Sequence, residues 1–393
     1  MKIYEIGTGY TPIPACMGAA TEIVVEELVK AFLKQNIPVE LIDIQAKDRL
    51  PNNLPIIEVP VPNSMSSTDV KLGIAHKLKR VVYSVSLANT LRKLLKNTKE
   101  RVILHFHNQY NLFFFYKLVP AALRRKACIV YTNHSYIWHD SWEMIEETIR
   151  KRYFQEVYCV KRADHVFVLN EQTRENLIKH VNVAPERIQL IGNGVNVNTY
   201  SVFDHEQNVQ NKHSWNCEGK KVFIQVGSVC ERKNQLTALK LLAPMMQKDR
   251  DILFCYAGGV IDPEYKAAME EYAQDQGIAE QVRYVGELQP GKQLNSFYNL
   301  ADAMVFPSKA EGFSLVIIEA MAAGVPVLID KNLRFEMADK CLQFDGDAMF
   351  ANIVSKCIFD ADSRNDLAVK CRQTVVDMYS WEKISRDYMA VLK

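Results

Sequence analysis

The sequence lacks any regular spacing of cysteines, although it contains nine of them. No two form a Cys-x-x-Cys pair, and scattered single thiols are typical of reduced side chains rather than of a disulfide framework. The sequence also lacks a long apolar run. Its most apolar stretch, residues 111–123, contains Lys117 and Pro120 and is too short to span a bilayer.

Low-complexity tracts and short-period repeats are absent too. Residues 1–10 do not show the basic and then apolar pattern of a signal peptide. The composition, 48% hydrophobic and 24% charged, is that of a globular protein without a disorder signature. We therefore expect a cytoplasmic protein.

Charge is unevenly divided along the chain. Residues 1–195 contain 26 Lys and Arg against 19 Asp and Glu, whereas the remainder contains 22 against 27. Two interpretations stay open: solvated helix faces, or attraction of the first half to an anionic membrane surface or a phosphate-bearing acceptor. The basic groups cluster in residues 76–80, 91–99, 123–126 and 150–152.

Short apolar segments alternate with amphipathic segments almost throughout. This alternation predicts parallel sheets covered by helices on both faces. Amphipathic patterns predict helices at residues 22–35 and 171–181, and the polar residues 204–219 are predicted to form a loop. Strands are predicted at residues 2–6, 39–44, 102–107, 127–132, 165–169 and 188–192, and again at 221–228, 252–259, 281–287, 301–308 and 325–330.

The length of 393 residues and the interrupted alternation predict two domains. We expect an α/β protein with two doubly wound, Rossmann-like domains facing across a cleft. The predicted boundaries are residues 1–195, residues 196–379, and a helix at 380–393 that packs back on the first domain. Ligands of open parallel sheets bind beyond the carboxyl ends of the strands, so function is sought in the loops that follow strands.

The first of these loops, residues 7–22, is long and glycine-bearing. Gly7 and Gly9 follow a strand, but the spacing to a third glycine does not fit a dinucleotide-binding fingerprint. Gly18 stands just before a helix, where small residues let an anion approach backbone amides. A tight helix entry explains the same residues equally well.

Three histidines lie at strand ends. His105 and His107 share one face of a strand, and either His134 or His139 could complete a metal site with them. No carboxylate stands at ligand spacing, so we predict no metal. His134 lies where residues 127–132 end, which is a position for a site residue, although a lone histidine is often only a packing residue.

Two loops in the second half suit a diphosphate. Gly227 follows a strand and precedes Arg232 and Lys233, so flexible backbone stands next to point charges. Exposed basic residues are common in loops, and alone this signal is weak. Further on, Ser314 is a good N-cap and Gly324 suits the end of a helix, so amides 313–315 are predicted at a helix N-terminus.

Glu311 and Glu319 bracket that helix start within an otherwise apolar run. Eight residues, mostly helical, separate the two carboxyl groups by roughly 10 Å along the chain. A retaining glycosidase needs its two carboxylates roughly 5 Å apart, so this pair does not act on one bond. Each glutamate is better suited to accept hydroxyls at one end of an extended polar ligand.

At this point the chain resembles the retaining family 4 glycosyltransferases, which have the GT-B fold. The resemblance rests on motif content and order. The matching segments are the glycine loop at residues 13–22, VFVLNEQTRENL, IGNGVNVNTYSVF, VGSVCERKNQ, and residues 284–328 with their Glu-x7-Glu motif.

The resemblance implies roles for individual residues. Glu311 would contact hydroxyls of the donor sugar, Glu319 the ribose of the nucleotide, and His134 the sugar from the first domain. The phosphates would be bound by Lys233, with Arg232, and by backbone near Gly18, Gly227, Gly312, Phe313, Ser314 and Leu315. One departure is Ser228, which stands where the family often has an arginine, so Arg232 must reach in or the diphosphate is left to Lys233 and backbone.

The resemblance implies transfer of a hexosyl unit, with retention and without a metal, from a nucleotide diphosphate sugar to a glycan or lipid-linked acceptor. It implies no cofactor, a UDP-sugar as the first donor to test, and a role in cell-surface polysaccharide or lipopolysaccharide synthesis at the inner face of the membrane. Nucleic acid is not expected as a partner. Two alternatives are a sugar-nucleotide epimerase or hydrolase on the same scaffold, and a non-catalytic sugar-nucleotide-binding partner.

Overall fold

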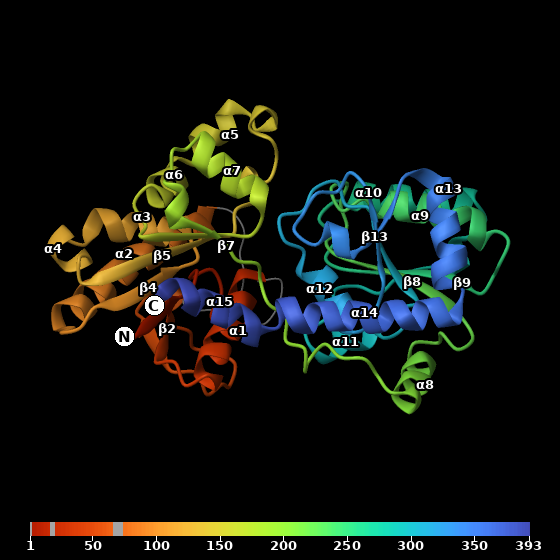
Figure 1. Cartoon of the computed structure of the whole chain (residues 1–393), viewed down its shortest axis with the longest axis horizontal. Coiled ribbons are helices and arrows are strands. Elements are labelled where there is room, and N and C mark those ends of the chain that lie inside the picture. Colours follow the sequence, from red (N-terminus) through yellow and green to blue (C-terminus); the bar gives the residue numbers. More distant parts are fainter. Residues whose placement is uncertain (1, 16–19, 66–73) are drawn as a thin grey trace. The chain divides into compact units, whose positions relative to one another are not determined.

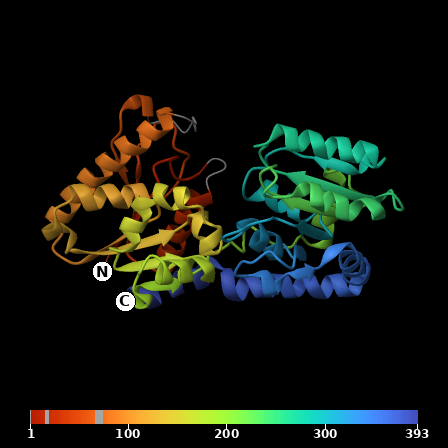
Figure 2. The same ribbon diagram turned by 90° about the horizontal axis from the view of Figure 1, so that it is seen from above.

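The computed structural model describes residues 2–15, 20–65 and 74–393, and the chain divides into two compact units. Unit 1 consists of Met1–Gly194 together with Ile384–Lys393, and unit 2 is Val195–Lys383. Figures 1 and 2 both show the C-terminal end of the chain, in blue, among the elements of unit 1. The chain therefore leaves unit 1 once and returns to it.

Unit 1 contains a seven-stranded sheet of order β3-β2-β1-β4-β5-β6-β7, with every neighbouring pair parallel. Its strands are β1 (Ile3–Ile6), β2 (Val39–Ile44), β3 (Ile56–Val59), β4 (Val102–Phe106), β5 (Ala127–Asn133), β6 (His165–Val168) and β7 (Ile188–Leu190). Its helices are α1 (Ala20–Lys34), α2 (Ile74–Asn97), α3 (Gln109–Leu118), α4 (Ala121–Arg124), α5 (Glu147–Arg152), α6 (Phe154–Val160), α7 (Glu171–Lys179) and, from Ile384 on, α15 (Trp381–Leu392).

The two faces of the unit 1 sheet are covered differently. Tyr4 and Ile6 of β1 belong to the same apolar cluster as residues of α2 and α3. Because side chains alternate along a strand, Glu5 points to the opposite face. On that face Tyr388 of α15 packs edge-on against Phe167 of β6, with ring centroids 4.6 Å apart. Figure 1 shows α15 beside α1.

Unit 2 contains a six-stranded parallel sheet of order β10-β9-β8-β11-β12-β13. Its strands are β8 (Lys221–Val226), β9 (Ile252–Ala257), β10 (Val282–Tyr284), β11 (Ala303–Phe306), β12 (Val327–Asp330) and β13 (Leu342–Phe344). Its helices are α8 (His205–Ser214), α9 (Gln235–Met246), α10 (Pro263–Asp275), α11 (Lys292–Tyr298), α12 (Leu315–Ala322), α13 (Gly346–Ile353) and α14 (Ala361–Tyr379).

The topology brings particular loops together. In unit 2 the strand order reverses between β8 and β11, which are neighbours in the sheet. The loops that leave their carboxyl ends, residues 227–234 and 307–314, therefore meet at the switch point where open α/β sheets bind ligands. In unit 1 the same edge carries the residues that follow β1, β4 and β5. The predicted fold class, with two Rossmann-like units, is confirmed.

Several expectations for single elements were wrong. Residues 204–219 were predicted to be a loop, but His205–Ser214 form α8. Asp204 accepts a hydrogen bond from the backbone N–H of Gln207, and the Gln207 side chain accepts one from the backbone of Asp204, so a capping box starts a helix that lacks an apolar stripe. The short edge strands β3 and β13 were not predicted. Among the described residues, no helix combines the length and apolarity needed to cross a membrane.

Candidate functional site

Glu311 lies in the loop after β11 and gathers cationic and hydroxyl donors on one of its oxygens. Its Oε1 atom is 2.6 Å from Lys233 Nζ and 2.7 Å from Ser308 Oγ. The Glu311 side chain is 7% exposed and that of Lys233 12% exposed. In the described part of the chain, no donor contacts Glu311 Oε2. One oxygen is thus held by the protein while the other is left for a ligand.

Lys233 owes its position to the glycine loop after β8. Gly227 has φ 148°, and a Cβ there would lie 3.3 Å from Lys233 Cε, so the bare backbone gives room to the lysine stem. Burial lowers the pKa of Lys233 against the opposing attraction of Glu311. Gly258, after β9, has φ 140°, and a Cβ there would lie 2.1 Å from Gly227 O, which fixes the two loops at close approach. A desolvated ammonium is thereby held at the switch point.

Arg232 is placed at the edge of this cluster. Its Nη1 atom is 3.5 Å from Glu311 Oε1 and donates to Ala310 O at 3.2 Å. The side chain is 53% exposed. Arg232 is therefore close to Lys233 in space, but its guanidinium is largely open to solvent.

The N-terminus of α12 has an unusual cap. Ser314 occupies the N-cap position with φ −91° and ψ 99°, and its side chain makes no capping hydrogen bond. Within the described residues, Ser314 Oγ is buried without a hydrogen-bond partner. The first N–H groups of a helix have no intrahelical acceptor and favour a negative charge. A buried hydroxyl and these amides together suit a phosphate oxygen.

The residues around the cap are predicted nucleotide contacts. Phe313 packs on the unit 2 core, with its ring centroid 5.9 Å from that of Tyr379. Leu315 is the first residue of α12, and Gly312 lies one residue before Phe313 in the same loop. The predicted helix is confirmed, with Ala323 as C-cap and Gly324 at φ 75° just beyond it. Gly18 lies outside the described residues.

Glu319 stands within α12 and has different partners from Glu311. It accepts a hydrogen bond from Tyr298 OH at 2.8 Å. Burial raises the pKa of Glu319 to about 7, against the opposing effect of hydrogen bonds from Tyr298 and Tyr200. The carboxyl group is thus balanced between its neutral and ionised forms near neutral pH.

In unit 1, His134 belongs to a cluster that the sequence revealed only in part. His134 Nε2 is 3.0 Å from His107 Nδ1, and His107 Nε2 is 2.8 Å from Glu5 Oε2. The other oxygen of Glu5 is 2.9 Å from His105 Nδ1. Both Glu5 and the two strand histidines are fully or almost fully buried. His139 is not part of this hydrogen-bonded group.

The expectation that no carboxylate accompanies the histidines was wrong. Glu5 supplies one, because β1 and β4 are neighbours and Glu5 is the direct register partner of His105. In the described residues, Glu5, His105 and His107 form the one group of this kind whose ligand atoms all lie within 4.8 Å of one another. A hundred residues separate Glu5 from His105, and only the strand pairing brings them together.

The basic segments of unit 1 are partly used in internal contacts. Lys126 donates to Leu95 O and Thr98 O, and Arg124 donates to Tyr116 O. The guanidinium of Arg80 stacks over the ring of Tyr110 at 3.8 Å. These contacts account for some of the positive charge without a ligand. Other basic side chains, among them Lys151 at 75% exposed, remain at the surface.

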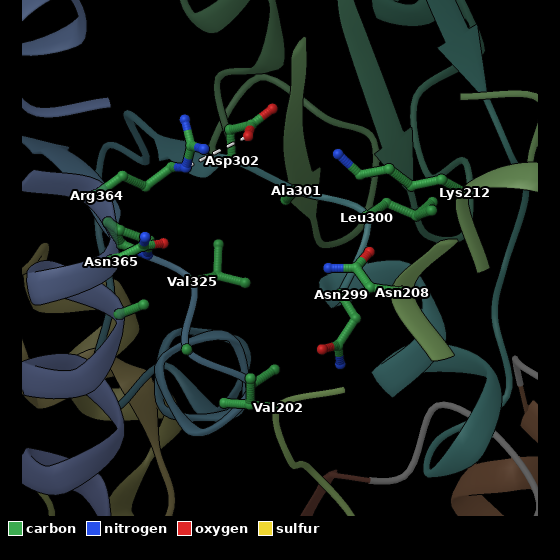
Figure 3. Close-up of a pocket in the computed structure, with 14 residues that line it drawn as sticks. Val202, Asn208, Lys212, Asn299, Leu300, Ala301, Asp302, Val325, Arg364 and Asn365 are labelled. Atoms are coloured by element: carbon green, nitrogen blue, oxygen red, sulfur yellow. Dashed lines mark ion pairs between the residues drawn. The ribbon is translucent and has the colours of Figure 1, made fainter. Parts of the chain in front are cut away.

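A cavity of about 210 Å³ lies elsewhere in unit 2. Figure 3 shows Asn208 and Lys212 of α8 on one side of it and Arg364 and Asn365 of α14 on the other. The rest of its lining is Val202, Ala368 and residues 299–302 and 323–326, and these two ranges precede β11 and β12. The cavity is thus at the amino ends of the strands, the opposite edge from Glu311, and Arg364 there is paired with Asp302 at 3.6 Å. It is not part of the candidate site.

Comparison with known proteins gives matches along most of the chain. Residues 21–199 match the family described as Glycosyltransferase Family 4, and residues 207–334 match Glycosyl transferases group 1. The O-antigen chain mannosyltransferase RfbU of Salmonella typhimurium is 28% identical over 273 residues, which are 69% of this chain and 67% of that protein.

Other matches are more distant or shorter. A UDP-Gal:alpha-D-GlcNAc-diphosphoundecaprenol alpha-1,3-galactosyltransferase of Escherichia coli is 23% identical over 303 residues, 74% of each chain. Matches to D-inositol 3-phosphate glycosyltransferases of Corynebacterium cover less than half of those proteins. In fold, the chain is similar to Anabaena HepE, solved with UDP and glucose, with a TM-score of 0.72, 15% identity, and coverage of 100% of this chain and 99% of that one.

Proposed function

The chain belongs to the family 4, or group 1, glycosyltransferases, a retaining family with the GT-B fold, and on this premise we propose that it transfers a hexosyl unit from a nucleotide diphosphate sugar to an acceptor hydroxyl. The observation that carries the proposal is the cluster of Lys233, Glu311 and Ser308 at the switch point of unit 2. A buried cation beside a helix N-terminus suits a diphosphate. A carboxylate with one open oxygen suits a sugar hydroxyl.

The proposed mechanism needs no nucleophile from the protein. The acceptor attacks the anomeric carbon on the face from which the diphosphate departs, and a leaving phosphate oxygen takes the acceptor's proton. The protein must then stabilise negative charge on the diphosphate. Lys233 and the amides at the start of α12 are fixed in place before the reaction, so they stabilise this charge without reorganising. We infer that transfer persists after removal of divalent metals with a chelator.

The remaining site residues follow the same logic. Glu319 accepts the ribose hydroxyls of the nucleotide, and His134 contacts the donor sugar from unit 1. Arg232, which is largely exposed, adds attraction for the diphosphate in place of the arginine that the family often has at the position of Ser228. Gly227 and Gly312 would allow backbone to approach the phosphates, and the same role is proposed for Gly18 on the family resemblance alone.

We propose UDP-sugars as the first donors and a glycan or lipid-linked acceptor, in polysaccharide or lipopolysaccharide synthesis at the cytoplasmic face of the membrane. The support comes from relatives whose names state O-antigen and diphosphoundecaprenol substrates. The exposed basic residues of unit 1 would favour an anionic membrane surface. A thermal-shift comparison of UDP-, GDP-, ADP- and TDP-sugars identifies the donor, because a ligand raises stability by RT ln(1 + [L]/Kd).

Replacing either central residue should abolish most transfer. We expect Lys233→Ala and Glu311→Ala to lower kcat by about 100–1000-fold, the usual loss for one preorganised electrostatic donor. Lys309→Ala is the matched control, since Lys309 lies two residues before Glu311 in the same loop, but is 52% exposed and pairs with Glu231. The measurement is turnover with purified, folded variants at saturating donor and acceptor. Near-normal turnover in both variants would refute the site.

Turnover also separates the alternatives. An epimerase or hydrolase consumes the donor without an acceptor, whereas a transferase requires one. A non-catalytic partner binds the donor and shows no turnover across a broad acceptor panel.

A further inference from the structure

A continuous set of hydrogen bonds runs from the core of unit 1 to His134. Glu5 is at its centre, with Oε1 on His105 Nδ1 and Oε2 on His107 Nε2. One branch continues from His105 Nε2 to Thr132 Oγ1 at 2.7 Å, and Thr132 lies 3.4 Å from the hydroxyl of Tyr388. The other branch continues from His107 Nδ1 to His134 Nε2 at 3.0 Å.

The direction of each hydrogen bond follows from Glu5. An ionised carboxylate only accepts, so His105 must carry its proton on Nδ1 and His107 its proton on Nε2. A neutral imidazole has one donor and one acceptor nitrogen. The second nitrogen of His107, Nδ1, therefore accepts, and His134 must donate to it from Nε2. His134 Nδ1 is left without a proton.

The surroundings keep His107 and His134 neutral. Burial lowers the pKa of His107 to about 4, and it also lowers the pKa of His134 well below its usual range, with a further contribution from His107. For Glu5, burial would raise the pKa, but the two imidazoles outweigh it and lower the pKa to about 2. The carboxylate is thus ionised and the two histidines of this branch are neutral at physiological pH.

We propose that Glu5 is a positioning residue which, through His107, holds His134 in the Nε2–H tautomer and so presents Nδ1 as a hydrogen-bond acceptor to a hydroxyl of the donor sugar. That His134 meets a sugar rests on the proposed function, whereas its tautomer does not. A site built around a hydroxyl rejects analogues that lack it, because the polar atom is then left unpaired. The donor should therefore carry a free hydroxyl at the position that His134 contacts.

If a metal ion stood in place of these hydrogen bonds, each histidine would carry its proton on the other ring nitrogen. His105 Nδ1 and His107 Nε2 would be ligands, and their other nitrogens would carry the protons. The observed separations of 2.9 and 2.8 Å between carboxylate oxygens and ring nitrogens are those of hydrogen bonds. Ligand atoms around tetrahedral zinc, at bonds of ~2.0 Å, lie roughly 3.3 Å apart. The geometry favours protons over an ion.

The tautomers can be measured without activity. Long-range 1H–15N correlation spectra of the full chain with 15N-labelled histidine distinguish protonated from bare ring nitrogens, and His134→Asn and His107→Gln assign the signals. We expect Nδ1–H for His105, and Nε2–H for His107 and His134. The proposal is overturned if His134 carries its proton on Nδ1, or if the purified protein contains stoichiometric metal. Correct tautomers together with no turnover of any donor would refute the proposed function instead.

Glu5→Gln then links the tautomer to catalysis. The amide can accept from only one imidazole and must donate to the other. The hydrogen bonds of one branch, and with them the tautomers of its histidines, therefore have to reverse. If His134 reverses, kcat/KM for the donor should fall about 10-fold, and the loss should disappear when the change is made in a His134→Ala background. If the Thr132 branch reverses instead, kcat/KM should stay unchanged. Loss without reversal of His134, or reversal without loss, would contradict the proposal.

Thr132→Val is the matched control. It removes the hydroxyl donor to His105 but leaves the His107–His134 contact in place. We expect lower stability with kcat/KM within about 2-fold of the wild type, since an unpaired buried acceptor affects folding rather than the tautomer of His134. Suppose that His134 carries its proton on Nδ1 in Glu5→Gln. An equal loss of kcat/KM in that variant and in Thr132→Val would show that the network is only structural.

Discussion

At the scale of single residues, the two glutamates of the Glu-x7-Glu motif are held in different ways. Glu311 accepts hydrogen bonds from Lys233 and Ser308, whereas Glu319 is buried and accepts a hydrogen bond from the phenol of Tyr298. Their partners are distinct, which agrees with two separate contacts rather than a catalytic pair. Because of these surroundings, we expect nucleotide binding and stability to depend on pH.

Nucleotide binding should strengthen as pH rises through about 7. Burial raises the pKa of Glu319 to about 7, and only the ionised carboxylate accepts both ribose hydroxyls. Below that pH, affinity should fall by up to about tenfold per pH unit, because binding then requires loss of a proton. Titration calorimetry of the nucleoside diphosphate between pH 5.5 and 8.5 measures this, and the dependence should be absent in Glu319→Gln. The same slope in wild type and variant would show that another group titrates.

The same carboxyl group affects the stability of the free protein. Its folded-state pKa is raised above the value of 4.5 expected for an exposed glutamate, so its contribution to the free energy of unfolding is largest below that value and is lost as pH rises through 7. Glu319→Gln removes this loss. The variant should therefore gain thermal stability relative to the wild type at pH 8 more than at pH 5.

At the scale of elements, α12 has ends that the sequence predicts but an N-cap that departs from the usual pattern. Ser314, Gly324 and the apolar run between them were sufficient to predict its start and end. Among the residues that the structure describes, the Ser314 hydroxyl nevertheless has no hydrogen-bond partner, whereas an N-cap serine normally accepts a hydrogen bond from the first turn. A helix that omits this hydrogen bond leaves its amides to a ligand.

Removing the Ser314 hydroxyl should reduce donor binding without weakening the fold. Ser314→Ala takes away a buried hydroxyl that has no partner in the described part of the chain, so the melting temperature of the variant should be equal to or above that of the wild type. Donor affinity should fall about 10-fold through loss of one charge-assisted hydrogen bond to a phosphate. Ser308→Ala, which removes the donor to Glu311 Oε1, is the comparison and should lose stability. Unchanged affinity in Ser314→Ala would place the diphosphate elsewhere.

Other elements could not be predicted, for physical reasons that differ. α8 starts from a capping box and has little apolar periodicity, so a search for periodicity missed it. β3 and β13 are short strands at the sheet edges. Each is defined by pairing with a single neighbouring strand, and the sequence does not display that pairing. Glu5 looked like part of an ordinary strand, because its role depends on a register with His105 that a single sequence does not display. Loop residues next to recognisable strands, such as Lys233 and Glu311, could be named as site candidates because sequence order places them at the sheet edge, while their individual roles came from the family resemblance and stay predictions.

At the scale of the whole molecule, the two units share one chain but contain separate cores. Lys233, Glu311 and Glu319, the proposed donor contacts, all belong to unit 2, whereas His134 and Tyr388 belong to unit 1. A core substitution in unit 1 should therefore lower the stability of unit 1, and a bound nucleotide should raise the stability of unit 2.

Loss of the Tyr388 ring should destabilise unit 1 selectively. Tyr388 is fully buried, packs on Phe167 and His105, and approaches Thr132. Tyr388→Ala should cost about 3–5 kcal/mol, as for other large aromatic core truncations. Differential scanning calorimetry should show one transition moved down, while a nucleoside diphosphate still raises the other. A variant in which both transitions fall equally would show that the units unfold as one.

The return of the chain to unit 1 also bears on how the protein is made. The ribosome adds about 5–20 residues per second, so on the order of 10–40 s pass between Gly194 and Ile384. During that interval the sheet of unit 1 lacks α15, so Phe167 and His105 are without the Tyr388 ring that packs on them in the finished protein. Unit 2, which is contiguous in sequence, can mature in the same period. Synthesis thus completes unit 2, for which donor binding is proposed, before it completes unit 1, and the surface that α15 later covers is where a nascent-chain chaperone would be expected to bind.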